Sequence, residues 1–505
     1  MKSHSAPLAA ACLLVCLPAL AAAADMSAAV LPNQGAAQWS WSAPALPKPV
    51  SPSRQVEELA TPLRSVPQPL TPGTNLTLKR AISLALTYHP LLREAAAQSG
   101  AAQERVGEAR SYLGPQLYGV AQYLRSTDNG IGNTSYYDPF GLYPRMSGRN
   151  HDLPAAEAFN QSWDTSNNYM GGLALSQFLF DFGRRHNYVM QRQFEAQAAE
   201  ANRQVTQLDL IFEVSARYFR LLQAMQLVRV YEKAVEQRQF HLHEARTKAK
   251  AGLRPQLDVY LTTAAVERAQ LHLVDARNQV ADAKVALDNA MGLSESSPDY
   301  RPAEVLTYQP ITEKIADLLH TAFLLRPDLK MVEDEARAMG AQIAEYRSDY
   351  LPTVSAVGGY AGMGTGTPVA NNFNVGLMIT WPIFNSYLTT DQVGEAKFHQ
   401  HALDDALEDL RQRIILQVHT AYLDWIASVQ RIQRAQAALS ASQVELQLAD
   451  QRYRTGLTNI VELEDAQRYY TQDDAAYADA LYSYSLAKAA IEQATGSSLA
   501  QNPLP

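Results

Sequence analysis

Two long segments of the chain carry an apolar stripe in which every fourth position is hydrophobic. The first stripe is Leu210, Val214, Tyr218 and Leu222, and the second is Ile414, Val418, Tyr422 and Ile426. This spacing places each stripe along one side of an α-helix. Gln, Ala, Glu and Arg fill much of the remaining surface, so we expect the helices to pack side by side in an antiparallel coiled wall. A soluble helical bundle is the alternative.

Helical periodicity in the first segment holds from about residue 184 to residue 250. A helix of that length extends about 100 Å at the standard rise per residue. Because this exceeds an ordinary globular domain, the pattern predicts a coiled or tube-like assembly. A second helix is expected from about 256 to 291.

Alternation with a period of two predicts short strands. We expect these strands at one end of the long helices and the turns between the helices at the other end. Leu117, Gly119, Ala121 and Tyr123 alternate with their neighbours, and a second strand is expected from about 169 to 180. In the second half, one face of a strand is apolar and consists of Phe373, Val375, Leu377, Ile379 and Trp381. Such a face suits lipid, with Trp381 as an interfacial anchor. A strand of a soluble sandwich is the alternative.

The same order of elements occurs twice along the chain. At an offset of 237 residues, the matching positions are Ala85 with Ala322, His89-Pro90 with Arg326-Pro327, and Pro115 with Pro352. After the next loop the offset is 204 residues, and the matches include Gly172 with Gly376, Gly252 with Gly456, and Gly292 with Gly496. A constant offset over so long a stretch indicates an internal repeat. The difference, 237 minus 204, places 33 additional residues in a loop at 125–166.

Each half therefore reads as helix, strand, loop, strand, very long helix, hairpin and long helix. The predicted fold is mainly α with a small β part, and it is duplicated. Two strands per half give four per chain, whereas the smallest membrane barrels have about eight. Lipid satisfies no open sheet edge, so a membrane-crossing form of this chain must be a closed barrel to which several chains donate strands.

Each long helical segment ends in a glycine-containing turn. Gly252 and Gly456 stand where a residue in the left-handed conformation closes a helix. After the second turn, Thr458 and Asn459 are expected to cap the next helix, because their side chains accept hydrogen bonds from its free N–H groups.

Two acidic residues follow the second turn. Glu462 and Asp465 are three positions apart and lie on one face of the next helix. Acidic residues early in a helix are favoured by its dipole in any case, so a purely structural role is the alternative to a binding role.

The ends of the chain differ in composition from its middle. Lys2, the apolar run 8–20 and the small residues 22–24 are typical of a secretory leader, which would also contain both cysteines, Cys12 and Cys16. Nine prolines between residues 32 and 72 exclude a long helix there. We predict a signal peptide at 1–24, a Pro-rich extended arm at 25–75, a first repeat at 76–296, a linker at 297–310, a second repeat at 311–496 and a tail at 497–505.

Composition and motifs exclude several function classes. The net charge of -8 argues against nucleic acid as a partner. We find no Ser/His/Asp set, no paired-acid site and no phosphate-binding loop, so no enzymatic activity, cofactor or metal is expected. His241 and His243 are two apart on a helix and point to different sides, so we expect a solvent-facing pair and no shared metal.

These features together resemble the TolC-like outer membrane efflux proteins, over residues from about 76 to 496. The resemblance rests on the duplicated layout, on Leu-x-x-Ala-Ile-x-x-Ala-Leu-x-x-His-Pro at 78–90, on Pro115 and Pro352 at the helix-to-strand switches, and on the Gly-Leu turns at 252 and 456. It implies a homotrimer with a twelve-stranded β-barrel in the outer membrane lipid and a periplasmic α-helical coiled-coil tunnel.

The resemblance also implies a function. The protein would be a passive exit duct of a tripartite efflux or type I secretion system, for drugs, small toxins or polypeptides. Its expected partners are a periplasmic adaptor (membrane fusion) protein and an inner-membrane RND or ABC transporter.

By the same resemblance, the two hairpins form the closed periplasmic entrance of the tunnel. Asp258 and Tyr453 would hold inner and outer coils together by a hydrogen bond. Glu462 and Asp465 would form carboxylate rings at the constriction, where three copies would draw cations. The family carries a basic residue at the position of Thr458, so one closing link is expected either to be absent or to be supplied by Arg254 of the first hairpin.

Two other function classes remain as alternatives. A soluble periplasmic coiled-coil scaffold or adaptor is one, although adaptors are expected to carry a single helical hairpin between β-rich modules. A secreted enzyme is the other, and no catalytic site supports it.

Overall fold

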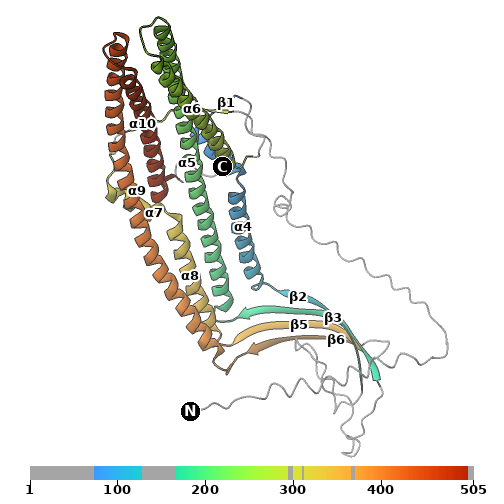
Figure 1. Ribbon diagram of the computed structural model, residues 1–505. Coiled ribbons are helices and arrows are strands. Elements are labelled where there is room, and N and C mark those ends of the chain that lie inside the picture. The colour runs from blue at the N-terminus through green and yellow to red at the C-terminus, as the bar shows by residue number, and fades with distance from the viewer. Residues whose placement is uncertain (1–72, 128–164, 294–299, 310–311, 365–369, 499–505) are drawn as a thin grey trace, which may run out of the picture. The chain divides into compact units, whose positions relative to one another are not determined.

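The computed structural model describes residues 73–127, 165–293, 300–309, 312–364 and 370–498, all within the compact unit Leu63–Pro505 (Figure 1). The predicted leader, nearly all of the Pro-rich arm and most of the loop at 125–166 lie outside the described residues.

The first half contains β1 (Thr74–Leu76), α3 (Leu78–Tyr88), α4 (Pro90–Ser111), β2 (Gln116–Thr127), β3 (Thr165–Phe180), α5 (Arg184–Lys250) and α6 (Gln256–Ala290). The second contains β4 (Tyr300–Pro302), α7 (Ile315–Leu325), α8 (Pro327–Ser348), β5 (Thr353–Gly364), β6 (Ala370–Thr380), α9 (Leu388–Arg454) and α10 (Ile460–Thr495). The predicted duplicated order, mainly α with a small β part, is confirmed.

The two longest helices correspond to each other in the two halves. Helices α5 and α9 each have 67 residues. Each forms a hairpin with the helix that follows it, and α10 also packs along α5. The shorter helix α4 lies against α5, while α8 lies between α5 and α9 (Figure 1). These contacts join the two halves into one wall of helices.

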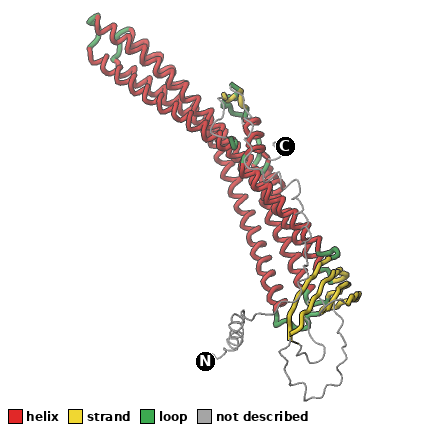
Figure 2. Tube along the Cα trace, turned by 90° about the vertical axis from the view of Figure 1, so that its right-hand side faces the viewer, coloured by secondary structure: helices red, strands yellow, loops and turns green. Residues whose placement is uncertain are grey.

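The four strands of the two halves form one sheet in the order β2-β3-β5-β6, and all neighbouring strands are antiparallel. Strands β3 and β5 join the halves, with Leu173 opposite Tyr360. Figure 2 shows the sheet at one end of the long helices and the hairpin turns at the other. The prediction that the strands and the hairpin turns lie at opposite ends of the long helices is therefore confirmed.

The apolar stripes are buried where they begin. Val214, Tyr218 and Val418 are fully buried. Farther along α9, however, Tyr422 and Ile426 are only half-buried, and Trp425 lies in the core instead. Steps of four residues drift around a helix that has 3.6 residues per turn, so a strict four-residue stripe leaves the interface after a few turns.

A two-stranded parallel pair was not predicted from the sequence. Strand β1 pairs with β4, which lies inside the segment predicted to be a linker. Leu76, at the start of the predicted first repeat, is the last residue of β1, and Thr77 caps α3 by accepting from the Arg80 N–H at 3.2 Å. Strands of three residues are too short to show alternation.

Loop boundaries also differ from the prediction. Strand β2 continues to Thr127 and β3 begins at Thr165, so the connecting segment is shorter at both ends than 125–166. The backbone hydrogen bonds between β2 and β3 continue beyond the residues in which apolar and polar side chains alternate, so the alternation underestimates the length of both strands.

Two prolines mark where the shorter helices are divided. Helix α3 ends at Tyr88 and α4 begins at Pro90, while α7 ends at Leu325 and α8 begins at Pro327. Proline is favoured at the first position of a helix because its missing N–H is not needed there.

Among the described helices, none has both the length and the apolar character required for a membrane span.

Candidate functional site at the helical hairpins

Both hairpin turns close their helices through a left-handed glycine. Gly252 has a φ of 71° and Gly456 a φ of 80°. In each turn the next residue donates its N–H back to the helix, from Leu253 to the Lys248 carbonyl and from Leu457 to the Arg452 carbonyl, both at 2.9 Å. A side chain with a Cβ atom disfavours this conformation, which explains glycine at both turns.

The helix after the second turn is capped by side chains. Asn459 accepts a hydrogen bond from the Glu462 N–H at 3.1 Å, as the sequence predicts. Thr458 does not cap the backbone; its hydroxyl donates to the Glu462 carboxylate instead. A free N–H group at the start of α10 therefore has an acceptor, which stabilises the beginning of this helix.

Arg254 links the two hairpins directly. Its Nη2 atom donates to the Thr458 carbonyl oxygen at 3.0 Å and to the Tyr453 carbonyl oxygen at 3.3 Å. Its guanidinium carbon also lies 5.0 Å from the centroid of the Tyr453 ring. One arginine of the first turn thus holds the backbone of the second turn on both sides of Gly456.

Tyr453 is the centre of a small apolar core under the turn. Its side chain is fully buried, and the residues packed with it are Ala449, Ile460, Leu463 and Ala466. Lys248 of α5 places its Nζ 4.8 Å from the ring centroid. The turn of the second hairpin is therefore packed against the end of the first.

The predicted hydrogen bond between Tyr453 and Asp258 is not formed. Neither the Tyr453 hydroxyl nor the Asp258 Oδ2 atom has a hydrogen-bond partner among the described residues, although both are buried. Burial raises the pKa of the Tyr453 phenol, and the charge of nearby Asp258 raises it further. The two groups are neighbours, yet the hairpins are joined by Arg254 instead.

Glu462 and Asp465 lie at the start of α10, and both are half-buried. Arg452 Nη1 lies 3.0 Å from Glu462 Oε1, and Arg468 Nη2 lies 2.8 Å from Asp465 Oδ1. Neither arginine partner was predicted from the sequence. Arg468 is three residues after Asp465, so helical spacing alone was a usable signal, whereas the Arg452 pair depends on the turn geometry.

A second polar cluster lies on the helices behind the turns. His241 is only 6% exposed, whereas His243 is exposed. His241 was therefore wrongly predicted to face solvent. Its Nδ1 atom is 3.5 Å from Glu244 Oε2 and 4.0 Å from Asp450 Oδ1. The sequence could not show this, because Asp450 is in α9 and meets α5 only after folding.

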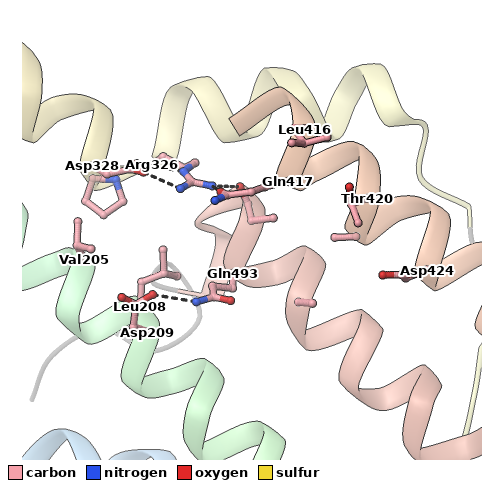
Figure 3. Close-up of a pocket in the computed structure, with 14 residues that line it drawn as sticks. Val205, Leu208, Asp209, Arg326, Asp328, Leu416, Gln417, Thr420, Asp424 and Gln493 are labelled. Carbon is pink, nitrogen blue, oxygen red and sulfur yellow. Dashed lines mark hydrogen bonds and ion pairs between the residues drawn. The ribbon is translucent and has the colours of Figure 1, made fainter. Parts of the chain in front are cut away.

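A cavity of about 520 Å³ lies where both halves meet, near the break between α7 and α8. Figure 3 shows Arg326 at its wall, pointing toward Gln417 of α9. Arg326 donates to Gln417 Oε1 at 2.8 Å and to the Ala494 carbonyl oxygen at 3.1 Å. Across the cavity, Gln493 donates to Asp209 at 2.8 Å. These contacts tie α10 to α5 and hold the long hairpins in register.

The apolar face of β6 is exposed in the part of the chain that the structure describes. Its most exposed members are Val375 at 85% and Phe373 at 81%, and the others are Leu377, Ile379 and Trp381. Trp381 donates its indole N–H to the Tyr350 carbonyl oxygen at 3.1 Å. A large exposed apolar face of this kind marks a surface that is covered in the working state of a protein.

Comparison with known proteins identifies the family. The sequence is 24% identical over 442 residues to outer membrane protein TolC of Salmonella enteritidis, which covers 83% of each chain. It is 24% identical over 440 residues to outer membrane protein OprJ of Pseudomonas aeruginosa, covering 79% of this chain and 89% of OprJ.

The fold agrees with these sequence relatives. The crystal structure of CusC superposes with a TM-score of 0.69 at 20% identity, over 86% of this chain and 97% of CusC. The model of the family described as "Outer membrane efflux protein" matches residues 81–293 and 318–497. This chain therefore belongs to the outer membrane efflux protein family.

Proposed function

We propose that three copies of this chain form one closed channel through the outer membrane. The observation that carries the proposal is the four-stranded sheet, whose outer strands β2 and β6 each pair on one side only within the described residues. Open edges are unfavourable in lipid, and four strands are too few to close a barrel. Three such sheets joined edge to edge make the twelve-stranded barrel.

The apolar face of β6 faces lipid in this assembly. Val375, Leu377 and Ile379 occupy alternate positions on that face and are strongly exposed in the single chain. Trp381 stands at the end of the row, where an aromatic side chain is favoured at the membrane interface.

The helical hairpins form the periplasmic entrance of the tunnel. Three copies bring Glu462 and Asp465 together around the axis, where rings of carboxylates attract cations. Arg452 and Arg468 neutralise part of this charge in each chain. Arg254 holds the entrance closed by tying the two turns together. Asp258 and Tyr453 contribute burial and charge to the same contact without a hydrogen bond.

The channel is passive and receives its substrate from other proteins. Its partners are a periplasmic adaptor protein and an inner-membrane RND or ABC transporter, which supplies the energy. A duct that crosses only the outer membrane needs such a complex to move drugs, small toxins or polypeptides out of the cell. The membership in the efflux family supports this arrangement.

Cysteine labelling tests the orientation of the sheet. Both native cysteines lie at positions 12 and 16, so Leu377→Cys gives a single probe in a chain without that leader. We expect it to react with a lipid-soluble maleimide in outer membranes and to be protected from a water-soluble one. Met378→Cys lies on the opposite face of the same strand and is the matched control, which should react with the water-soluble reagent.

Fractionation and cross-linking test the assembly. We expect the protein in the outer membrane fraction, solubilised only by detergent and cross-linked to a trimer. Recovery in the soluble periplasmic fraction would refute the channel and favour the scaffold or adaptor alternative.

A further inference from the structure

The cluster behind the hairpin turns has the composition of a metal site. His241 and Glu244 come from α5 and Asp450 from α9, and their ligand atoms all lie within 4.8 Å of one another. Nδ1 of His241 and Oε2 of Glu244 are buried and have no hydrogen-bond partner among the described residues. These two buried atoms lie 3.5 Å from each other without a hydrogen bond, an arrangement that a bound ligand would satisfy.

We infer that His241, Glu244 and Asp450 bind one divalent transition-metal ion of the Zn²⁺ type, with water in the remaining position. Zn²⁺ takes imidazole nitrogen and carboxylate oxygen at about 2.0–2.2 Å, so two ligands of a tetrahedral ion lie about 3.4 Å apart. The distance from His241 Nδ1 to Glu244 Oε2 is 3.5 Å and needs no rearrangement. The distance to Asp450 Oδ1 is 4.0 Å and needs only a small side-chain rotation.

The electrostatics of the cluster agree with a cation. The two carboxylates carry a combined charge that a divalent ion neutralises. A bound ion would thus both coordinate the buried polar atoms and neutralise their charge.

Two basic residues neutralise part of the negative charge of Asp450 and Glu244. Arg454 Nε lies 3.1 Å from Asp450 Oδ1, and Lys248 Nζ lies 4.0 Å from Glu244 Oε1. Arg454 therefore competes with a metal ion for the same Asp450 oxygen, whereas Lys248 contacts the other oxygen of Glu244. Removal of Arg454 should tighten metal binding.

The site is placed to join the two hairpins. Its ligands come from the last turns of α5 and of α9, close behind Gly252 and Gly456. An ion there adds a coordinate link beside the Arg254 contact. The metal site itself does not depend on the proposed channel, since it is formed within one chain.

Direct binding to the purified full-length protein is the test. The protein is prepared in detergent without a histidine tag, titrated with Zn²⁺ by calorimetry, and followed with Co²⁺ by its d–d absorption. We expect one ion per chain, with affinity lowered about tenfold or more in His241→Ala and in Asp450→Asn. Arg454→Gln should raise the affinity.

His243→Ala is the matched control, because this histidine is exposed on the same helix two residues away. It should leave binding unchanged. Thermal unfolding shows that each variant is folded, and Zn²⁺ should raise the melting temperature of the wild type but not of His241→Ala. The absence of Zn²⁺ binding by the wild type, or equal affinity in folded His241→Ala and His243→Ala, would overturn the proposal.

Discussion

Arg254 donates a hydrogen bond to the carbonyl oxygen of Tyr453 at 3.3 Å, across the gap between the two helical hairpins. The same guanidinium packs against the Tyr453 ring. A residue from the first repeat therefore holds the turn of the second repeat. Because both turns lie at the proposed entrance, we expect this contact to resist separation of the hairpins.

Loss of Arg254 should open the entrance. Arg254→Met keeps most of the side-chain volume but removes two hydrogen bonds to backbone carbonyl oxygens. Bonds from a charged donor contribute about 1.5–3 kcal/mol, so the closed state loses much of its advantage. We expect single-channel conductance to rise several-fold. Arg246→Met, an exposed arginine on α5, is the control and should conduct like the wild type.

The role of Tyr453 should lie in its ring and not in its hydroxyl. Tyr453→Phe removes a hydroxyl that has no hydrogen-bond partner among the described residues, so conductance should stay close to that of the wild type. Tyr453→Ala creates a cavity in the core under the turn and should lower the free energy of unfolding by about 3–5 kcal/mol. Because the turn is then packed less well, we expect its conductance to rise. Conductance recordings of both variants check this. An increase in Tyr453→Phe as large as that in Tyr453→Ala would show that the hydroxyl bonds to Asp258 after all.

Stability should fall as pH rises because of Glu345 in α8. Burial raises the pKa of this carboxyl to about 7, above its ordinary value, while Arg184 and Arg192 lower it in part. A carboxyl with a raised folded-state pKa binds more protons in the folded protein. Its stabilising effect is therefore complete below the unfolded pKa and is lost as pH rises toward 7.

Thermal unfolding between pH 5 and pH 8 measures this effect. We expect the melting temperature of the wild type to decrease across that range and the profile of Glu345→Gln to be flatter. Glu333→Gln, on the same helix, is the control and should keep the wild-type slope. Identical slopes for wild type and Glu345→Gln would contradict the assignment.

The hydroxyl of Tyr218 should stabilise the fold. Tyr218 is fully buried in α5 and donates to the Leu76 carbonyl oxygen at 2.8 Å, which ties the helix to β1. Tyr218→Phe leaves the Leu76 carbonyl oxygen without its donor and should lower the free energy of unfolding by about 1–2 kcal/mol. Thermal unfolding should show a lower melting temperature, whereas Tyr260→Phe, at an exposed position, should not change it.

Much of the fold was readable from local patterns. The bounds of α5 agree with the predicted 184–250, because helical periodicity and the glycine at position 252 mark its end. The Gly252 and Gly456 turns and the Asn459 cap are also local features, determined by backbone conformation and the nearest N–H groups. Each of these depends on residues only a few positions apart.

Contacts between distant segments were not readable in this way. Asp450 reaches His241 only because α9 lies near α5 in the folded chain, so the cluster has no sequence signal. Arg452 pairs with Glu462 through the shape of the turn. Strand β4 was missed because it pairs with a strand more than two hundred residues earlier.

One-sided block of the channel in planar lipid bilayers tests the central claim most directly. Wild-type protein should give cation-selective steps of conductance, and a multivalent cation should block them only when added to the side that carries the hairpins. Glu462→Ala/Asp465→Ala should lose both properties, while Asp317→Ala, an exposed acid on α7, should keep them. Unchanged selectivity and block in the double variant, or no conductance from the wild type, would contradict an entrance at these hairpins.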